Sequence, residues 1–187
     1  MGLFKKTTKP SQQAYAVVTG AGSGIGQSFA LALGKRGGTV VCADINLAAA
    51  EKTVALLAEH GAKAYAVACD VGKAEQVAEL AEQAEQLMQH PVTLVINNAG
   101  VGLGGKFDEL SLEDWQWVTH VNLWGVIHGC HFFVPKFKKL GHGAIINVAS
   151  AAGYTAAPEM TAYNVTKSGV LGLSETLFSE LKKSNIK

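Results

Sequence analysis

Short apolar runs alternate along the chain with longer segments in which apolar residues recur at helical spacing. The runs are rich in Val, Ile and Ala and lack polar alternation, so they predict strands that are covered on both faces. We expect these strands at residues 14–19, 39–44, 63–70, 92–97 and 143–150. Strands that alternate with helices imply right-handed crossovers. The pattern therefore predicts an α/β fold with a parallel sheet between two layers of helices.

Local signals predict where several of the helices begin and end. Gly61 is a good C-terminal cap for the helix before it, and Pro91 should stop the next one. Ser111 with Asp114 three residues later resembles a capping box. The segment at 115–129, "WQWVTHVNLWGVIHG", reads as part of one long helix.

The chain shows no repeat, low-complexity tract or linker, so it predicts one domain over residues 1–187. Residues 1–12 are polar and mildly basic, and we expect a flexible N-terminal arm there. They lack the apolar core of a signal peptide, and no apolar run approaches the roughly 20 residues that span a bilayer.

Composition narrows the class of protein further. A hydrophobic content of 48% with 17% charged residues indicates an ordered globular chain. The formal net charge of +1 gives no reason to expect a nucleic acid or an anionic membrane as partner.

The candidate metal-binding residue types are not arranged as ligands. Cys42, Cys69 and Cys130 are odd in number and widely spaced, so neither a disulfide framework nor a zinc site is predicted. A reducing cytoplasm is the simplest compartment for such a chain. His128 and His131 share a helix face but have no third ligand spaced with them, and we interpret them as packing or surface residues.

A glycine-rich turn joins the first strand to the first helix. In "TGAGSGIG", Gly20, Gly22, Gly24 and Gly26 precede a helical pattern directly. Glycine permits a tight turn and close approach to a pyrophosphate, and the helix N-terminus supplies free N–H groups. The turn predicts a Rossmann-type, doubly wound dinucleotide-binding fold. The alternative is a glycine-rich turn without a ligand.

Asp44 ends the second strand, where such a fold places the acid that hydrogen-bonds the adenosine ribose. A carboxylate there would also repel a 2′-phosphate. Ser23 is not basic, and Ile45 and Asn46 add no positive charge. The position therefore favours NAD over NADP. Asp44 could alternatively, or in addition, cap the following helix.

The chain resembles the short-chain dehydrogenase/reductase family in motifs that occur in the family's order over nearly its whole length. They are "TGAGSGIG" (19–26), "DV" (70–71), "NNAG" (97–100), Asn122, Ser150 and "YNVTK" (163–167). The spacing of the glycines is that of the branch with T-G-x-x-x-G-x-G. No one motif is specific, but the ordered set is.

The resemblance implies how a dinucleotide would be held. Asp70 would hydrogen-bond the adenine amine with the Val71 backbone beside it, and the "NNAG" segment would border the cofactor. The residues that we expect to bind it are Gly20, Ser23, Gly24, Ile25, Gly26, Asp44, Ile45, Asp70, Val71, Asn98, Ala99, Gly100, Tyr163 and Lys167.

The resemblance also implies a catalytic set of Asn122, Ser150, Tyr163 and Lys167. Tyr163 would transfer the proton and Ser150 would hydrogen-bond the substrate oxygen. Lys167 would bind the nicotinamide ribose and favour the ionised phenol. Asn122 would help to anchor a water molecule next to Lys167.

The chemistry of the pair agrees without the family. Tyr163 and Lys167 are four residues apart, so on a helix both can point into one cleft. A free phenol has a pKa near 10 and is a poor base at neutral pH. A positive charge one turn away, with that of an oxidised nicotinamide ring, stabilises the phenolate, whereas burial opposes it.

Several aromatic residues crowd the region of the long helix. Trp115, Trp117, Trp124, Phe132 and Phe133 predict core packing there, or alternatively a hydrophobic face for a partner helix. Family members commonly pair through this helix and the tyrosine helix. The resemblance therefore implies a homodimer or homotetramer.

The chain departs from the family pattern after the tyrosine helix. Family members are usually longer and add a sixth strand, a segment that contacts the nicotinamide amide, a substrate-covering loop and a last strand. We expect a five-stranded sheet that is incomplete at its C-terminal edge, with an exposed fifth strand, and a chain that is truncated or lacks its tail.

The sequence predicts an oxidoreductase that uses NAD(H) to interconvert a secondary alcohol and a ketone. The expected pocket wall, at 101–105, 151–153 and 154–160, is small or apolar, with Glu159 as its one charge. This composition favours an uncharged, fairly apolar substrate. The alternative is a dinucleotide-binding sensor or scaffold without turnover.

Overall fold

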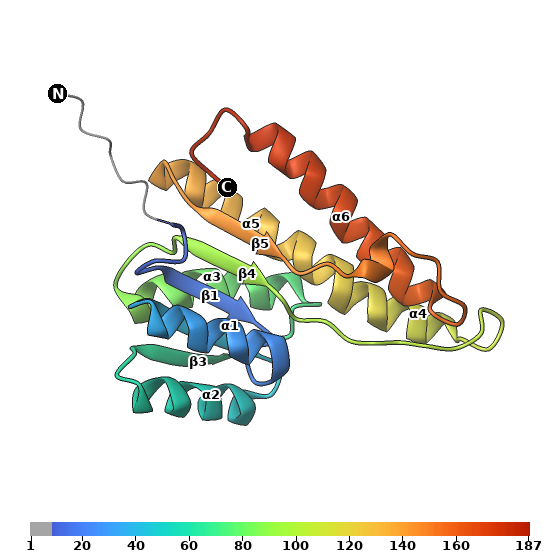
Figure 1. Ribbon diagram of the computed structural model, residues 1–187, viewed down its shortest axis with the longest axis horizontal. Helices are drawn as coiled ribbons and strands as arrows, with labels where there is room; N and C mark the ends of the chain where they lie inside the picture. Colours follow the sequence, from blue (N-terminus) through green and yellow to red (C-terminus); the bar gives the residue numbers. More distant parts are fainter. Residues whose placement is uncertain (1–8) are drawn as a thin grey trace.

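A computed structural model describes residues 9–187 and contains one parallel sheet (Figure 1). The strand order is β3-β2-β1-β4-β5. The strands are β1 Tyr15–Thr19, β2 Thr39–Asp44, β3 Ala64–Ala68, β4 Leu94–Asn97 and β5 Ala144–Asn147. The predicted N-terminal arm lies largely outside the described residues.

Helices cover both faces of this sheet, as the alternating pattern predicts. They are α1 Gly24–Lys35, α2 Leu47–Glu59, α3 Ala74–Met88, α4 Leu112–Thr119, α5 Gly125–Leu140 and α6 Thr161–Leu181. α1 and α2 pack on one face in one hydrophobic cluster, while α3, α5 and the end of α6 pack on the other face in a second. The three-layer, doubly wound Rossmann-type fold is therefore confirmed.

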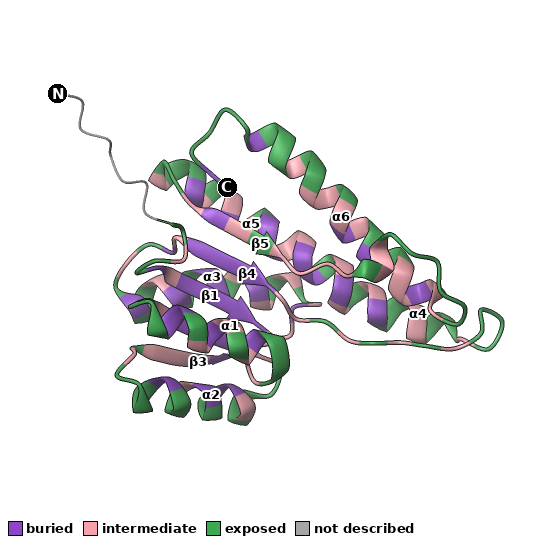
Figure 2. Cartoon of the chain, in the orientation of Figure 1, coloured by how far each residue is buried: buried purple, intermediate pink, exposed green. Residues whose placement is uncertain are grey.

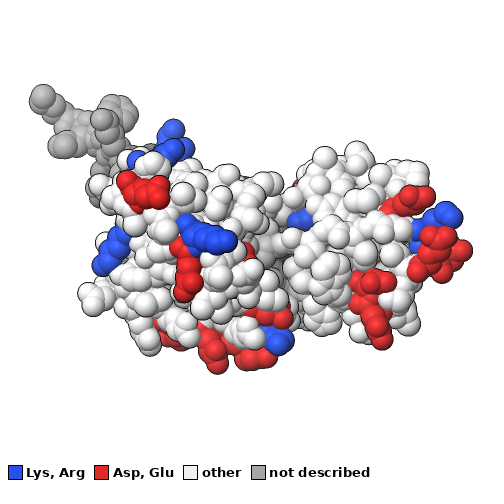
Figure 3. Space-filling model, turned by 90° about the horizontal axis from the view of Figure 1, so that it is seen from below, with Lys and Arg blue, Asp and Glu red and all other residues white. Residues whose placement is uncertain are grey.

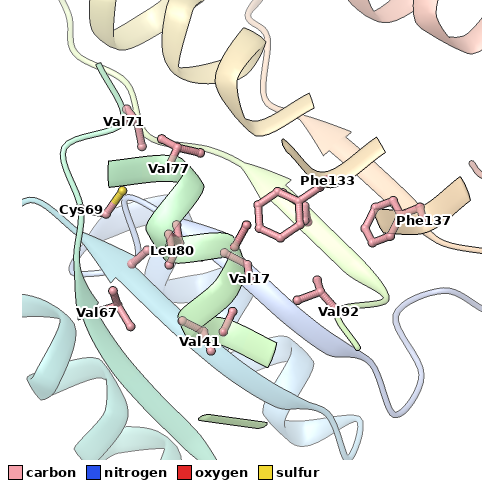
Figure 4. Packing of buried hydrophobic residues seen from close by; sticks show 14 of the residues in the cluster. Val17, Val41, Val67, Cys69, Val71, Val77, Leu80, Val92, Phe133 and Phe137 are labelled. Atoms are coloured by element: carbon pink, nitrogen blue, oxygen red, sulfur yellow. The ribbon is translucent and has the colours of Figure 1, made fainter. Parts of the chain in front are cut away.

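The central strands β1 and β4 are almost entirely buried, because helices cover both faces of the sheet (Figure 2). Phe133 and Phe137 of α5 lie over the sheet next to Val77 and Leu80 of α3 (Figure 4). Burying one such side chain contributes about 1.5–3 kcal/mol, which explains the continuous apolar runs of the sequence. On the surface seen in Figure 3, acidic and basic side chains are interspersed.

The predicted helix ends are correct except at α3. The side chains of Ser111 and Asp114 form a reciprocal capping box, and Gly61 follows α2 with a φ of +70°. α3 ends before Pro91, because Gln89 already adopts a left-handed conformation with a φ of +53°.

Three expected elements differ clearly in extent, and the strand expected at 143–150 is confined to β5. The strand expected at 63–70 is confined to β3, because the chain turns at Asp70 and the Asp70 carboxylate accepts the N–H of Gly72 at 3.0 Å. The long helix expected around 115–129 is interrupted by a π-helical turn at His120–Trp124, which joins α4 to α5.

The outer edge of β5 is only partly open. Ile186 forms a parallel bridge with Gly143, and the carbonyl of Lys187 accepts the N–H of Ile145 at 2.8 Å. Ile146 is 41% exposed at this edge. The expected exposed edge beside the fifth strand is therefore covered in part, because the last two residues begin to pair with it.

Within residues 9–187, none of the helices has the length and apolarity required to cross a membrane. The same part of the chain holds no group of three or more side chains suited to a metal ion.

Candidate active site

A cleft of about 700 Å³ opens at the carboxyl ends of the strands. In an open α/β sheet this edge is where ligands bind. Gly26 and Asn122 do not line the cleft, but the other predicted site residues do. They are Gly20, Ser23, Gly24, Ile25, Asp44, Ile45, Asp70, Val71, Asn98, Ala99, Gly100, Ser150, Tyr163 and Lys167.

The glycine turn has the geometry that its sequence predicts. Gly20 and Gly24 have φ values of +63° and +55°, which favour glycine. A Cβ on Gly26 would collide with the carbonyl oxygen of Gly20 and lie 2.5 Å from Nδ2 of Asn98. Gly26 thus stands behind the cleft and lets α1 pack against the turn.

The N-terminus of α1 is suited to a phosphate. Ser23 occupies the cap position, but its side chain makes no capping hydrogen bond, and the first turn carries no acidic residue. A Cβ on Gly24 would meet open space. Backbone N–H groups and the positive end of the helix dipole therefore face the cleft, and the site fits a pyrophosphate.

Asp44 lies at the end of β2 with its carboxylate held by two backbone groups. Gly22 N–H donates to Oδ2 and Asn46 N–H donates to Oδ1, both at 2.9 Å. The N-cap of α2 is Asn46, which accepts the N–H of Ala49. The alternative role of Asp44 as helix cap is therefore wrong.

The "NNAG" segment is fastened to the glycine turn through Thr19. Its hydroxyl accepts the N–H groups of Asn98 and Ala99 at 3.0 and 3.1 Å. The Asn98 side chain donates to the carbonyl oxygens of Thr19 and Gly20 at 2.9 and 3.3 Å. The ends of β1 and β4 therefore form one continuous floor for the cleft.

Lys167 and Tyr163 lie one turn apart on α6 and both line the cleft. The Lys167 ammonium donates to the carbonyl of Val148 at 2.9 Å and lies 5.7 Å from the centre of the Tyr163 ring. A Cβ on Gly100 would be 3.5 Å from Nζ, so glycine leaves room for the amine. Burial lowers the pKa of Lys167, because it disfavours the charged form.

Asn122 is fully buried in the π-helical turn and supports the cleft from behind. Its Oδ1 accepts the N–H of Val101 at 2.7 Å and its Nδ2 donates to the carbonyl of Val101 at 2.8 Å. Nδ2 also lies 3.3 Å from the hydroxyl of Thr166. The side chain thus joins the segment after "NNAG" to the helix that carries Lys167.

Ser150 follows β5 and caps a short 3₁₀ turn at Ala151–Gly153. Its hydroxyl oxygen accepts the N–H of Ala152 at 3.2 Å. This bond uses the oxygen as acceptor and leaves the hydroxyl proton for another partner.

Sequence reasoning missed several residues of the cleft. They are Cys69, Trp117, Val121, Val148 and Ala149. Trp117 and Trp124 are 49% and 45% exposed, so core packing is the wrong interpretation for them. The position of Trp117 four residues before Val121, on one helix face, was the available signal.

The predicted pocket wall is borne out only in part. Val101 and Gly102 line the cleft, whereas residues 151–160 do not. Gly105 N–H instead donates to the carbonyl of Glu159 at 2.8 Å, so the two expected wall segments are bonded to each other. Glu159 has a φ of +62° at this contact.

The sheet order, the glycine turn and the polar ends of β1, β2 and β4 define a nucleotide-binding Rossmann-type protein. A family model for short chain dehydrogenases matches residues 14–187. The chain belongs to the short-chain dehydrogenase/reductase family.

Relatives with curated descriptions and solved structures agree with this assignment. The chain is 39% identical over 173 residues to a cyclohexanol dehydrogenase from Acinetobacter sp. (strain SE19), which covers 92% of this chain and 68% of that protein. The crystal structure of a Burkholderia phymatum short chain dehydrogenase/reductase in complex with NAD matches with a TM-score of 0.92 and 38% identity. It covers 96% of this chain and 64% of that one. An NAD⁺-bound xylitol dehydrogenase matches with a TM-score of 0.90 and 30% identity, covering 96% and 69%.

The share of each relative's length that this chain covers varies widely. The chain spans 28% of the length of some curated relatives and 73% of another.

Proposed function

We propose that this protein is an oxidoreductase that interconverts a secondary alcohol and a ketone with NAD(H). The observation that carries the proposal is the arrangement of Tyr163, Lys167 and Ser150 around one cleft, with the Lys167 amine 5.7 Å from the centre of the Tyr163 ring. The relatives named a cyclohexanol dehydrogenase and a xylitol dehydrogenase act on alcohols by their descriptions, which supports the same reaction class.

Tyr163 is the proposed general acid and base. A bound nicotinamide would supply the hydride chemistry, and the chain supplies position and electrostatics. Ser150, whose hydroxyl proton is not used by its bond to Ala152, would donate to the substrate oxygen. In the oxidation, Tyr163 would take the proton of the alcohol, and in the reduction it would return a proton to the ketone oxygen.

Lys167 has two proposed roles in this reaction. Its ammonium favours the phenolate of Tyr163 electrostatically, and it can donate to the nicotinamide ribose. The bond to the carbonyl of Val148 holds the amine in place for both. Asn122 would support a water molecule beside Lys167 and keeps Val101 against the cleft.

The cofactor preference for NAD over NADP rests on Asp44. Its carboxylate is fixed by Gly22 and Asn46 at the rim of the cleft, where ribose hydroxyls can donate to it. A 2′-phosphate at the same place would meet a negative charge without a basic partner from Ser23, Ile45 or Asn46. The solved relatives that contain NAD support this choice.

The proposed substrate is uncharged and fairly apolar. Val101, Gly102 and Trp117 border the cleft and carry no charge.

Exposed apolar residues on and near α6, among them Trp124, Val165 and Phe178, support the proposed homodimer or homotetramer. The cytoplasm remains the proposed compartment, because all three cysteines are free and buried.

The test is turnover of a panel of secondary alcohols and ketones by the wild-type protein and by Tyr163→Phe, followed through NADH absorbance. The variant keeps the ring and removes the hydroxyl, and we expect activity to fall at least about 10²-fold. Tyr154→Phe is the matched control, because Tyr154 is exposed and does not line the cleft.

Two outcomes would contradict the proposal. Equal activity of Tyr163→Phe would remove the assigned role of Tyr163. NAD binding by calorimetry without turnover of any panel member would favour the dinucleotide-binding sensor or scaffold instead.

A further inference from the structure

His128 contacts the turn that is expected to hold the adenine. It lies half-buried on α5, and its Nδ1 is 2.9 Å from the carbonyl oxygen of Val71, which is 57 residues away in sequence. A carbonyl oxygen only accepts, so Nδ1 carries the hydrogen and donates it. The interpretation of His128 as a packing or surface residue therefore omits a long-range contact with the cleft wall.

The contact is made at the centre of a short turn. Asp70 N–H donates to Oε1 of Gln76 on α3 at 2.7 Å, and Gly72 N–H donates to Oδ1 of Asp70 at 3.0 Å. His128 on α5 binds the same turn at the carbonyl of Val71. Both Asp70 and Val71 line the cleft, so a shift of the turn moves the surface that a ligand touches.

The close packing of α5 against the turn brings His128 within reach of the Val71 carbonyl. A Cβ on Gly125 would lie 2.7 Å from Cγ2 of Val71, so the absence of a side chain there lets the helix approach the turn. His128 lies three residues later on the same face. The Trp124 ring lies 5.7 Å from the imidazole ring, centre to centre, at 35°, and borders it on the side of the π-helical turn.

We propose that His128 is a positioning residue for adenine recognition, which acts by holding the Val71 carbonyl and, through it, the Asp70 carboxylate. The proposal rests on the proposed use of NAD(H) and on the expectation from the family resemblance that this turn receives the adenine of NAD. It assigns to α5 a part in cofactor affinity, distinct from the part of the Tyr163 helix in catalysis. The ligand concerned is an adenine nucleotide, and the effect is confined to the adenosine end of the cleft.

The test compares His128→Leu with His128→Asn. Leucine fills a similar volume without a donor, whereas the asparagine amide can donate to the same carbonyl. The probe is AMP, whose binding is measured by calorimetry and needs no turnover. Removing one hydrogen bond weakens an equilibrium by roughly 3- to 10-fold. We expect His128→Leu to weaken AMP binding and raise the KM for NAD by this factor, with kcat unchanged at saturating NAD, and His128→Asn to recover most of the loss.

His131→Leu is the matched control, because His131 lies on the same helix, is exposed, and contacts Phe132 rather than the turn. Thermal unfolding of each variant reports folding separately. Unchanged AMP affinity in His128→Leu would overturn the proposal, as would an asparagine variant no better than leucine, a fall in kcat equal to the rise in KM, or a wild-type protein that does not bind AMP. A protein that shows the expected AMP series but no alcohol turnover would retain this inference and lose the proposed reaction.

Discussion

At the proposed adenosine end of the cleft, each of the two carboxylates accepts a backbone N–H from a residue two positions on in the sequence, and Asp44 also accepts the N–H of Gly22, 22 residues away. Asp44 accepts the N–H of Asn46, and Asp70 accepts the N–H of Gly72, each two residues on. At the proposed catalytic end, by contrast, the bonds of Lys167 and Asn122 are all long-range: Lys167 donates to Val148, 19 residues away, and Asn122 binds Val101, 21 residues away.

This difference has a physical consequence. The proposed adenosine end includes short-range turns after β2 and β3, so short motifs describe part of it. The catalytic end exists only after α6 and the π-helical turn have docked against the ends of β4 and β5. Changes to the catalytic end should therefore alter the reaction rate, whereas changes to the adenosine end should alter cofactor affinity and choice.

The largest effect should come from Lys167→Met at the catalytic end. Methionine keeps the length of the side chain and removes the charge that stabilises the phenolate, so kcat/KM should fall about 10²- to 10⁴-fold. AMP affinity should not change, because the adenosine end is untouched. Steady-state kinetics and AMP calorimetry measure the two effects.

Lys136→Met is the control for that variant. Lys136 pairs with Glu82 and Glu85 on the surface of α3 and does not line the active-site cleft, so its loss should leave kcat/KM unchanged. If Lys167→Met weakened AMP binding as much as turnover, the two ends would not be independent.

Gly26→Ala should affect both ends, because Gly26 lies against Asn98 of "NNAG" as well as against Gly20. The added Cβ meets backbone, which cannot move aside cheaply, and overpacking of this kind costs about 1–3 kcal/mol. We expect a lower melting temperature and weaker binding of AMP and NAD. Gly172→Ala, where a Cβ on α6 meets nothing within 4 Å, should leave binding and stability unchanged or slightly improve stability. Equal melting temperatures for Gly26→Ala and the wild type would show that the turn can accommodate the added methyl group, which would contradict this prediction.

Asp44→Asn should change cofactor choice with little effect on kcat. The amide retains an acceptor oxygen but not the charge that repels a 2′-phosphate, and the ratio of kcat/KM for NAD over NADP should fall about tenfold, or about 1.4 kcal/mol. Kinetics with both cofactors measure the ratio. Asp108→Asn, an exposed loop carboxylate, is the control. A ratio that does not move would count against the ribose assignment of Asp44.

The last expected effect concerns the buried thiols at alkaline pH. Burial raises the pKa of Cys42 and of Cys69 from 9.0 to about 12, so between these values the folded thiols stay protonated while the unfolded ones ionise. The folded state then binds more protons, and the free energy of unfolding falls as pH rises from 9 towards 12, by about 1.4 kcal/mol per thiol per pH unit.

Urea unfolding at pH 8 and pH 10 measures this slope. Cys42→Ala and Cys69→Ala, on the adenosine side, should make it shallower. Burial also raises the pKa of Cys130, but a hydrogen bond with Asn147 opposes this rise, so Cys130→Ala should change the slope less. Identical slopes in all three variants would remove this distinction between the two sides.

Features with local sequence signals could be predicted, whereas contacts between distant residues could not. The strands, the glycine turn and Asp44 could be predicted because their signals are local: apolar runs, glycines at a strand end and an acid at the next one. The resemblance to a family supplied Asn122 and Ser150, and the partner of Asn122, Val101, lies 21 residues away. The contact of His128 with Val71 could not be predicted from the sequence, because no sequence pattern around a histidine on an apolar helix indicates which distant residue it contacts.

The missed π-helical turn and the exposure of Trp117 have a related cause. Nothing in "HVNLW" disfavours an ordinary α-helix, and the buried Asn122 side chain, bound to both polar groups of the Val101 backbone, is a tertiary constraint. Periodicity therefore predicted a continuous helix with its aromatic residues in the core.

Because of this π-helical turn, the geometry of the site depends on how many residues join α4 to α5. A π-helical turn is equivalent to one residue inserted into an α-helix, and each residue of an α-helix advances about 100° and 1.5 Å. Deleting a single residue from His120–Trp124 would let this wider turn close into an ordinary α-helical turn, and Asn122 would lose its position beside Val101. Substitutions here can be absorbed one side chain at a time, but a change of length would disturb the support of the segment after "NNAG".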